Sequence, residues 1–523
     1  MNAKTIYSGA FILFAGNLLS SVLGLGREVL SAAYYGANVD MDAYLFANTI
    51  PSIVLSFFGG ILMGGFIPLF IKKRVENEEE ASNLFSNAMN WVVVIVLLLT
   101  AGLYALSDQV ASLFAIDAAS HQTIERLFWI LLPSILFFGL SYAQSAVLNS
   151  MNHFTMPALL TVMNNLVVIG FMVAFHRSLG IYSVAIGFVI GTALQVVVQW
   201  PVMRRMGVRY RLHLTWRDEH LKRLVAMSLP IIGLVTIDQA IVFATRYFAA
   251  YLDPGSASSI NYANRFVMLP VTLFGTALIS ATYPTVVTLI AERRKRDYNE
   301  IVTTTVKSLS LLLAPIMLTC MAFAPQLIQL LLERGAFDQK ATEMTSIAFL
   351  VLSIGILVIP VREFFMKLFF GQEKMKVPIF TSLIYMAVFI GSCFALIPRL
   401  KHMGIVLSTA VAMVASLSFL ILQYIRMDKG NRIGLPIGYV VKIGSSAILS
   451  AVAARLGYQA IMTVPAAQHA GPVFLLLSLC GSLLLYFLLV KWLGIQEIGF
   501  VYDKLSAKFN VRKRRSQAAV SKG

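Results

Sequence analysis

The stretch GAFILFAGNLLSSVLGLGREVLSAAYYG, residues 9–36, is an apolar run long enough to cross a membrane as one helix. A hydrocarbon core about 30 Å thick needs roughly 20 residues of α-helix. One lysine precedes the run, but no small-residue cleavage site interrupts it, so we interpret it as a retained first helix rather than a signal peptide. Arg27 and Glu28 lie inside it. The stretch therefore predicts a transmembrane helix that carries charge.

Similar apolar runs recur along the 523 residues, of which 58% are hydrophobic and only 13% are charged. This composition is typical of a chain whose solvent is lipid, and no segment between the runs is long enough to bury a soluble core. We therefore predict an all-α integral membrane protein with about fourteen transmembrane helices. The predicted helices span residues 8–34, 42–71, 83–108, 124–148, 155–176, 181–203, 222–251, 257–289, 300–325, 342–367, 376–397, 403–425, 437–460 and 470–493.

The short loops between the predicted helices alternate in charge. One set is basic and includes KKR at 72–74, RRKR at 293–296 and the C-terminal tail, whereas the other set has only scattered cations. Because cytoplasmic loops are enriched in lysine and arginine, we expect both termini in the cytoplasm, which requires an even number of helices. The same distribution explains the net charge of +17 as membrane topology rather than as a nucleic-acid-binding surface.

The sequence lacks the motifs of several classes of functional site. No predicted loop exceeds about 20 residues and no GxxxxGK[ST] phosphate loop occurs, so we expect no nucleotide-binding domain. The seven histidines lie in loops or at helix ends, and the apolar runs show no paired carboxylates or metal-ligand spacing. The three cysteines lie inside apolar runs and indicate neither a disulfide framework nor a thiolate metal site. We therefore expect no enzyme activity, no cofactor and no metal.

Charges inside the apolar runs are the candidate functional residues. Each costs roughly 2.5–3.5 kcal/mol at a helix centre unless it faces protein or water. Arg265 lies about 12 Å inward from the outer end of its predicted helix, which is too deep for easy access to the interface. Three guanidinium groups could therefore converge on one water-filled cavity. The charges are Arg27, Glu28, Asp238, Arg246, Arg265, Arg362 and Glu363.

Some of these charges also have a structural interpretation, but Arg27 and Arg265 are harder to explain in this way. Arg246 could simply reach the interface, and Arg362 with Glu363 could form an ion pair at a helix end. Because Glu28 lies about 100° round the helix from Arg27, we expect it to pair with another helix rather than with its neighbour. Four mid-membrane amides could line a polar cavity, although bridging between helices is their commoner role. These amides are Asn164, Asn165, Gln195 and Gln199.

A weak internal repeat relates the ends of the first and seventh predicted helices. GREVLSAAYYG at 26–36 and ATRYFAAYLDPG at 244–255 each place Ala-Ala-Tyr shortly after an arginine and before a turn. Repeat-built folds with a central site are common among transporters. We therefore predict an N-terminal six-helix lobe at 1–215, a C-terminal six-helix lobe at 216–430, two additional helices within 431–495 and a basic cytoplasmic tail at 496–523.

Five segments together resemble the MurJ/MviN flippases of the multidrug/oligosaccharidyl-lipid/polysaccharide exporter superfamily. The resemblance implies two six-helix lobes around a V-shaped cavity and two further helices grooved for a lipid tail. It also implies alternating-access transport of lipid II, the undecaprenyl-diphosphate-linked peptidoglycan precursor, from the cytoplasmic to the outer leaflet. The segments are SSVLGLGREVLSAAYYGANVDMDAYLFANTIP (20–51), VLNSMNHFTMPALLTVMNNLVVI (147–169), ALQVVVQWPVMRRMGVRYR (193–211), NYANRFVMLP (261–270) and LLERGAFDQKAT (331–342).

The resemblance also implies roles for particular residues. Arg27, Arg265 and Glu28 match the family's cavity arginines and first-helix acid, and a diphosphate needs such permanently charged, bidentate donors. We expect the substrate-binding residues to be Arg27, Arg265, Glu28 and Arg246. The candidates for coupling or for lining the cavity are Asp238, Asp42 and Asn165. The implied partners are the lipid-linked precursor, membrane lipids and the cell-wall synthesis machinery, without nucleic acid, at the cytoplasmic membrane.

The second predicted helix departs from the family pattern. Many members have an arginine pair and an Ala-Glu-Gly segment where this chain reads IPSIVLSFFGGILMGG (50–65), and Met268 stands where an acid often follows the eighth-helix arginine. Fewer cavity charges would suit another undecaprenyl-linked cargo, such as an exopolysaccharide or O-antigen unit. A cation-coupled drug exporter is a further alternative, although its cationic substrates would favour acids over arginines. An enzyme of lipid-linked sugar synthesis is the third.

Overall fold

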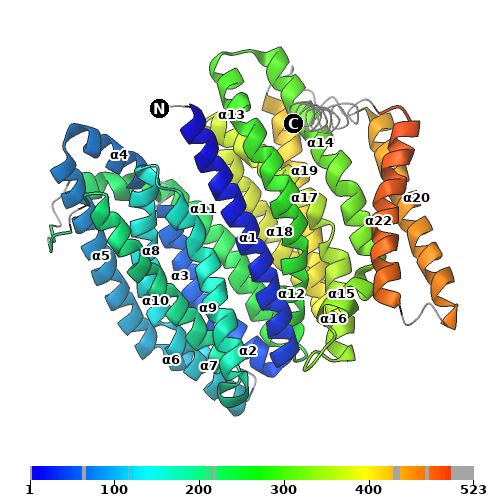
Figure 1. Cartoon of the computed structure of the whole chain (residues 1–523), viewed down its shortest axis with the longest axis horizontal. Coiled ribbons are helices and arrows are strands. Elements are labelled where there is room, and N and C mark those ends of the chain that lie inside the picture. Colours follow the sequence, from blue (N-terminus) through cyan, green and yellow to red (C-terminus); the bar gives the residue numbers. More distant parts are fainter. Residues whose placement is uncertain are drawn as a thin grey trace, which may run out of the picture. The chain divides into compact units, whose positions relative to one another are not determined.

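The computed structural model describes residues 3–61, 66–115, 117–208, 210–212, 214–215, 219–427, 436–465 and 470–495. Within these ranges the chain is helical and has no strand (Figure 1), which confirms the predicted all-α class. The first eleven helices are α1 (Ala3–Tyr35), α2 (Val39–Ala47), α3 (Thr49–Ile61), α4 (Ile67–Glu76), α5 (Glu78–Ala105), α6 (Ser107–Ser112), α7 (Ala118–Leu131), α8 (Pro133–Ser150), α9 (Thr155–Leu179), α10 (Tyr182–Arg205) and α11 (Glu219–Ala250). The remaining elements are α12 (Ser256–Pro270), η2 (Val271–Thr276), α13 (Ala277–Ala291), α14 (Lys295–Ala322), α15 (Ala324–Leu332), α16 (Gln339–Leu352), α17 (Gly355–Gly371), α18 (Lys376–Leu400), α19 (His402–Met427), α20 (Ile437–Met462) and α22 (Gly471–Trp492).

Twelve helical segments of the described chain are long and apolar enough to cross a membrane. One further pair, α16 and α17, passes the same test together but is bent by 41°, which gives up to 13 spans. Helix α1, 33 residues long, lies outside this set. The set of about fourteen crossings that the sequence predicts is reached when α1 and the bent pair are each taken as one crossing.

Several of the predicted helices are interrupted. The predicted helix 42–71 comprises α2, α3 and α4, and residues 62–65 within it lie outside the described ranges. The predicted helix 257–289 contains the π-helical segment η2 directly after Pro270, because proline has no N–H to donate to the preceding turn. The predicted helix 342–367 is the bent pair. Hydropathy locates a crossing, but it does not locate the kink inside it.

The chain divides into two compact units. The first comprises residues 1–266, 331–348 and 378–415, and the second comprises residues 267–330, 349–377 and 416–523. The boundaries of these units differ from those of the predicted lobes, 1–215 and 216–430. The division into two six-helix lobes stays a prediction. The predicted tail at 496–523 lies outside the described residues.

In the first unit, α9 packs against both α1 and α10, and α10 also packs against α8. Buried amides connect these helices. Oε1 of Gln195 accepts a hydrogen bond from Ser141 Oγ at 3.2 Å, and its Nε2 donates to the carbonyl of Leu160 at 3.1 Å. Oε1 of Gln199 accepts from Ser145 Oγ at 2.9 Å. The predicted bridging role is therefore confirmed for both glutamines, and it satisfies polar groups that lipid cannot.

In the second unit, α14 packs against α13, α17, α20 and α22. Two buried tyrosines attach the last two helices to it. The hydroxyl of Tyr439 on α20 donates to the carbonyl of Lys307, and that of Tyr486 on α22 donates to the carbonyl of Leu311, each at 3.0 Å. Because both acceptors lie on α14, this helix is the support on which the C-terminal helix pair packs.

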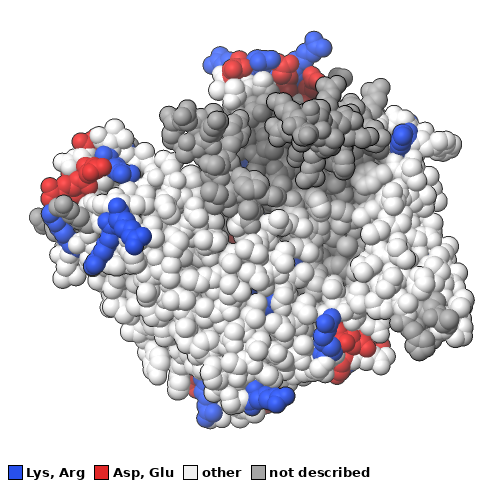
Figure 2. Space-filling view, viewed as in Figure 1, with Lys and Arg blue, Asp and Glu red and all other residues white. Residues whose placement is uncertain are grey.

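The flanks of the helices are apolar, and charged side chains gather at helix ends. Figure 2 shows charges near the α4–α5 and α13–α14 turns and very few along the flanks. Large apolar side chains are exposed there, such as Leu98 on α5 at 70% and Leu484 on α22 at 64%. Contiguous apolar surface of this kind needs lipid around it. The surface therefore agrees with the helix lengths in indicating a multi-span membrane protein.

Candidate functional site

A cluster of three charged side chains joins α1 to α12 in the first unit. Glu28 is 4% exposed. Its Oε1 lies 2.8 Å from Nη2 of Arg27 and 3.4 Å from Nε of Arg265. The side chain of Arg27 is 19% exposed, whereas that of Arg265 is 55% exposed. One buried carboxylate therefore holds two arginines, and one of these arginines remains widely accessible.

The pairing of Arg27 with Glu28 corrects the sequence prediction. Neighbouring residues on a helix point about 100° apart, which favoured a partner for Glu28 on another helix over its neighbour Arg27. The arginine side chain is long enough for its guanidinium group to reach round the helix to the neighbouring carboxylate, and it does so here. The expected partner on another helix is also present, since Arg265 on α12 contacts the same oxygen.

Arg246 on α11 is fastened to α12. Its Nη2 donates to Oδ1 of Asn261 at 3.1 Å, and its Nη1 donates to the carbonyl of Ala257 at 3.5 Å. Asn261 lies one turn before Arg265 on the same face of the helix. Arg246 also interacts electrostatically with Glu28. It therefore belongs to the same charged cluster, with its guanidinium directed at α12.

Asp42 on α2 caps the start of α12. Its Oδ2 accepts a hydrogen bond from the N–H of Gly255 at 2.8 Å, and its Oδ1 accepts one from the N–H of Ser258 at 2.7 Å. The first N–H groups of a helix have no partner inside it, so a carboxylate placed there stabilises the helix end. Asp42 thereby positions the helix that carries Arg265.

Three glycines let the turns around this cluster approach one another. Gly36, Gly255 and Gly335 all have positive φ, of 69°, 90° and 62°, a conformation that other residues rarely adopt. A Cβ at Gly36 would overlap the carbonyl oxygen of Ala336, and one at Gly335 would overlap that of Ala33. The N–H of Ala336 donates to the carbonyl of Ala33 at 2.8 Å. The end of α1 is therefore seated against the loop that precedes α16.

The remaining predicted residues have other partners. Oδ1 of Asp238 on α11 accepts a hydrogen bond from Ser382 Oγ on α18 at 3.5 Å. Nδ2 of Asn165 on α9 donates to the carbonyl of Ser20 on α1 at 3.2 Å, so this amide bridges two helices. In the second unit, Glu363 pairs with Lys367, one turn further along α17, at 2.9 Å.

The cluster carries a net positive charge. The three arginines, Arg27, Arg246 and Arg265, outnumber the two buried carboxylates that interact with them, Glu28 and Asp42. Each guanidinium is permanently charged and presents five donors in a planar fork, which fits two oxygens of a phosphate group at once. Within the described residues, no group of three His, Cys, Asp or Glu side chains could hold a metal ion. The arrangement is therefore suited to hold an anion with several oxygens by direct contact with arginine.

Reasoning from the sequence missed the residues that position these arginines. Gly255, Ser258 and Asn261 lie at the start of α12 and hold Asp42 and Arg246 in place. Of these three residues, Asn261 could have been found from its spacing in the sequence. Asn261 stands four residues before the deep Arg265, and residues at this spacing share a helix face.

Comparisons with known proteins point to one group of membrane transporters. The family model described as "Lipid II flippase MurJ" matches residues 31–479. The lipid II flippase MurJ of Burkholderia cenocepacia is 27% identical over 75% of this chain and 79% of its own length. The probable lipid II flippase MurJ of Bdellovibrio bacteriovorus is 25% identical over 95% of this chain and 96% of its own length.

Two solved structures share the fold. "Lipid II flippase MurJ, inward closed conformation" matches with a TM-score of 0.79 at 23% identity and covers 92% of this chain and 98% of that one. An inward-facing multidrug resistance transporter of the MATE family matches with a TM-score of 0.69 at 13% identity and covers 80% of this chain and 96% of that one.

Proposed function

The chain belongs to the MurJ family of lipid II flippases, and on that premise we propose that it moves lipid II from the cytoplasmic to the outer leaflet of the cytoplasmic membrane. Such a carrier performs no covalent chemistry. It offers the charged headgroup a path through a region where a bare charge costs several kcal/mol, while the prenyl tail stays in lipid.

The observation that supports this proposal is that one carboxylate, Glu28, forms ion pairs with both Arg27 and Arg265. Without an internal counter-charge, two arginines at this depth would be costly. With it, they stay charged and oriented before the substrate arrives. In the proposed mechanism, the diphosphate makes bidentate contacts with Arg265, the more exposed of the two, and competes with Glu28 for Arg27. Arg246 adds to the positive potential from α11.

The proposed cycle is alternating access. The lobes open toward the cytoplasm, take up the headgroup, and then open toward the outer leaflet. The basic turns at 72–74 and 293–296 support an orientation with these turns and both termini in the cytoplasm. We assign Asp238 to coupling, whereas the contacts of Asp42 and Asn165 favour support of the cavity wall. The product would be used at the outer leaflet by the cell-wall synthesis machinery.

Two other cargoes are the alternatives. A different undecaprenyl-linked oligosaccharide would use the same diphosphate contacts, and the absence of charge from residues 50–65 of the second predicted helix favours it. A cation-coupled drug exporter would share the fold, as the MATE structure does, but a site with an excess of arginine repels cations.

Depletion of a cell's resident lipid II flippase tests the proposal. We expect expression of this chain alone to restore growth and to prevent lipid II from accumulating. Lysis with accumulated lipid II despite normal membrane levels of this chain would refute the assignment. Restoration of a surface polysaccharide in a strain that lacks the corresponding flippase, without rescue of growth, would establish the alternative cargo.

A further inference from the structure

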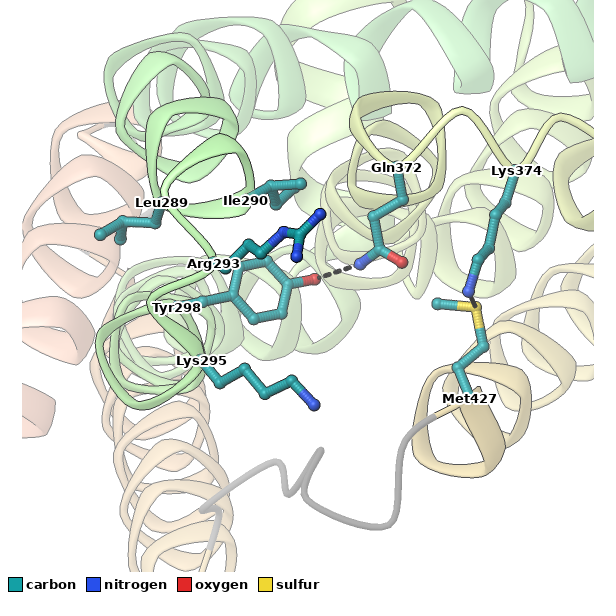
Figure 3. A pocket seen from close by; sticks show the side chains of 8 residues that line it. All are labelled: Leu289, Ile290, Arg293, Lys295, Tyr298, Gln372, Lys374 and Met427. Atoms are coloured by element: carbon teal, nitrogen blue, oxygen red, sulfur yellow. Dashed lines mark hydrogen bonds between the residues drawn. The ribbon is translucent and has the colours of Figure 1, made fainter.

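A cleft in the second unit lies where α13 and α17 end and α14 begins. Its volume is about 250 Å³, and three cations line it. Figure 3 shows Arg293 and Lys295 reaching toward it from one side and Lys374 from the other. Across it, Nε2 of Gln372 donates to the hydroxyl of Tyr298 at 3.0 Å, which ties α17 to α14. The cleft is therefore a braced, basic recess and not a gap between loose turns.

The backbone itself places two of these cations. Arg293 has a φ of 57°, which is uncommon for a residue other than glycine. The N–H of Arg294 donates back to the carbonyl of Leu289 at 3.1 Å, as in a Schellman cap of a helix C-terminus. Glu373 has a φ of 58° and forms the equivalent cap after α17, just before Lys374. The same cap therefore sets Arg293 and Lys374 on opposite sides of the cleft.

The charges of Arg293 and Lys374 are not compensated by any carboxylate in the described part of the chain. Nζ of Lys374 lies 3.1 Å from Sδ of Met427, which is only a weak acceptor. Arg294, next to Arg293, is instead paired with Asp297 at 2.5 Å. Stabilisation of helix ends would explain a cation at each end. It does not explain why Arg294, which is paired with a carboxylate, lies outside the cleft, whereas Arg293 and Lys374 line it.

We propose that this cleft binds the phosphate group of an anionic membrane lipid. The apolar spans that border it end at Ala291, begin at Lys295 and end at Met427, which places the cleft at the depth of lipid headgroups. Leu289 and Ile290 form an apolar wall beside the cations, and this wall suits the start of an acyl chain. A soluble phosphate would use the cations but not the wall. Basic pockets between transmembrane helices are the usual receptors for anionic headgroups.

Native mass spectrometry of the purified full-length protein with phosphatidylglycerol tests the proposal. We expect the wild-type protein to retain at least one phosphatidylglycerol under conditions that remove phosphatidylcholine. The double variant Arg293→Ala/Lys374→Ala should bind this lipid about 25-fold more weakly, at about fivefold for each cation removed. The matched control is Arg294→Ala, which removes a neighbouring cation that does not line the cleft and should bind as the wild type does.

Three outcomes would overturn the proposal. They are equal affinity of the double variant, equal retention of phosphatidylcholine, and displacement of the lipid by millimolar inorganic phosphate, which would mark a site for a soluble anion. If the double variant does not fold, the single variants Arg293→Gln and Lys374→Gln replace it, each with an expected loss of about fivefold. Wild-type affinity in both single variants would equally refute the site.

Discussion

The cluster around Glu28 and the cleft around Arg293 are both sites where arginine could meet phosphate, but they treat its charge in opposite ways. In the cluster, a carboxylate that is 4% exposed contacts two arginines. In the cleft, Arg293 and Lys374 have no such partner among the described residues. Arg246 and Arg265 of the cluster lie on helices that are long and apolar enough to span a membrane, whereas the cleft lies at the ends of such helices.

The difference follows from solvation. A cation at the interface is hydrated and can remain without a counter-ion, but a cation deep in the membrane cannot. The internal carboxylate has a second effect, because it competes with any anion that arrives. A carrier must release its cargo, and a site with a built-in competitor binds less tightly than one without. We therefore expect the cluster to exchange its ligand and the cleft to retain one.

Loss of transport is the largest effect expected. Arg27→Ala and Arg265→Ala should each abolish complementation at near-normal membrane levels, because the diphosphate loses a charged donor in a region of low dielectric. The variant Arg293→Ala/Lys374→Ala should still complement. Growth of a flippase-depleted strain, with immunoblots of membranes, measures both. Full complementation by either cluster variant would sink its assignment to transport, and loss of protein would show a structural role instead.

Removal of the shared carboxylate should mainly reduce stability. In Glu28→Gln the two arginines lose their counter-charge, and we expect a loss of about 3 kcal/mol. This loss is at the low end of the range for breaking a buried ion pair, because Arg265 is 55% exposed and water replaces part of its contact. Thermal unfolding in detergent measures the change. The double variant Arg27→Gln/Glu28→Gln should recover part of the loss, and no recovery would show that the pair with Arg27 contributes little.

A lysine at position 265 should reduce the transport rate about tenfold without abolishing transport. Lysine keeps the charge but lacks the planar fork that contacts two oxygens of a phosphate. Lipid II accessibility at the outer leaflet, measured over time in cells that express Arg265→Lys, checks this. A wild-type rate would mean that charge alone suffices at this position.

The smallest expected effect is a difference between the two sites in their sensitivity to salt. Raising ionic strength from 0.1 to 1 M shortens the Debye length from about 10 to about 3 Å, which screens exposed charges far more than buried ones. Phosphatidylglycerol binding at the cleft should weaken severalfold, whereas the thermal stability conferred by Glu28 should hardly change. Equal salt sensitivity of the two readouts would remove the distinction between the sites.

The sequence predicts the fold well because membrane thickness fixes the length of an apolar run. It also singles out the charged residues that form the cluster, since a charge such as Arg265 inside such a run needs a reason to be there. It does not predict the cap that Asp42 provides, because the N–H groups that Asp42 accepts from begin 213 residues further along the chain. The cleft escapes prediction for another reason. Arg293 reads as one of four basic residues in a cytoplasmic turn, and only its positive φ places it in a recess.

The glycines at 36, 255 and 335 have a consequence for how this end of the first unit can move. Their turns meet backbone to carbonyl, with no side chain in between that could bend or slide. A direct contact between backbones cannot adjust gradually, so we expect these turns to be either in contact or apart. One added methyl group would act as a wedge and raise the population of parted conformers, while every charge of the cluster stayed in place. The three glycines would therefore set how readily these turns separate, because any larger residue would hold their backbones further apart.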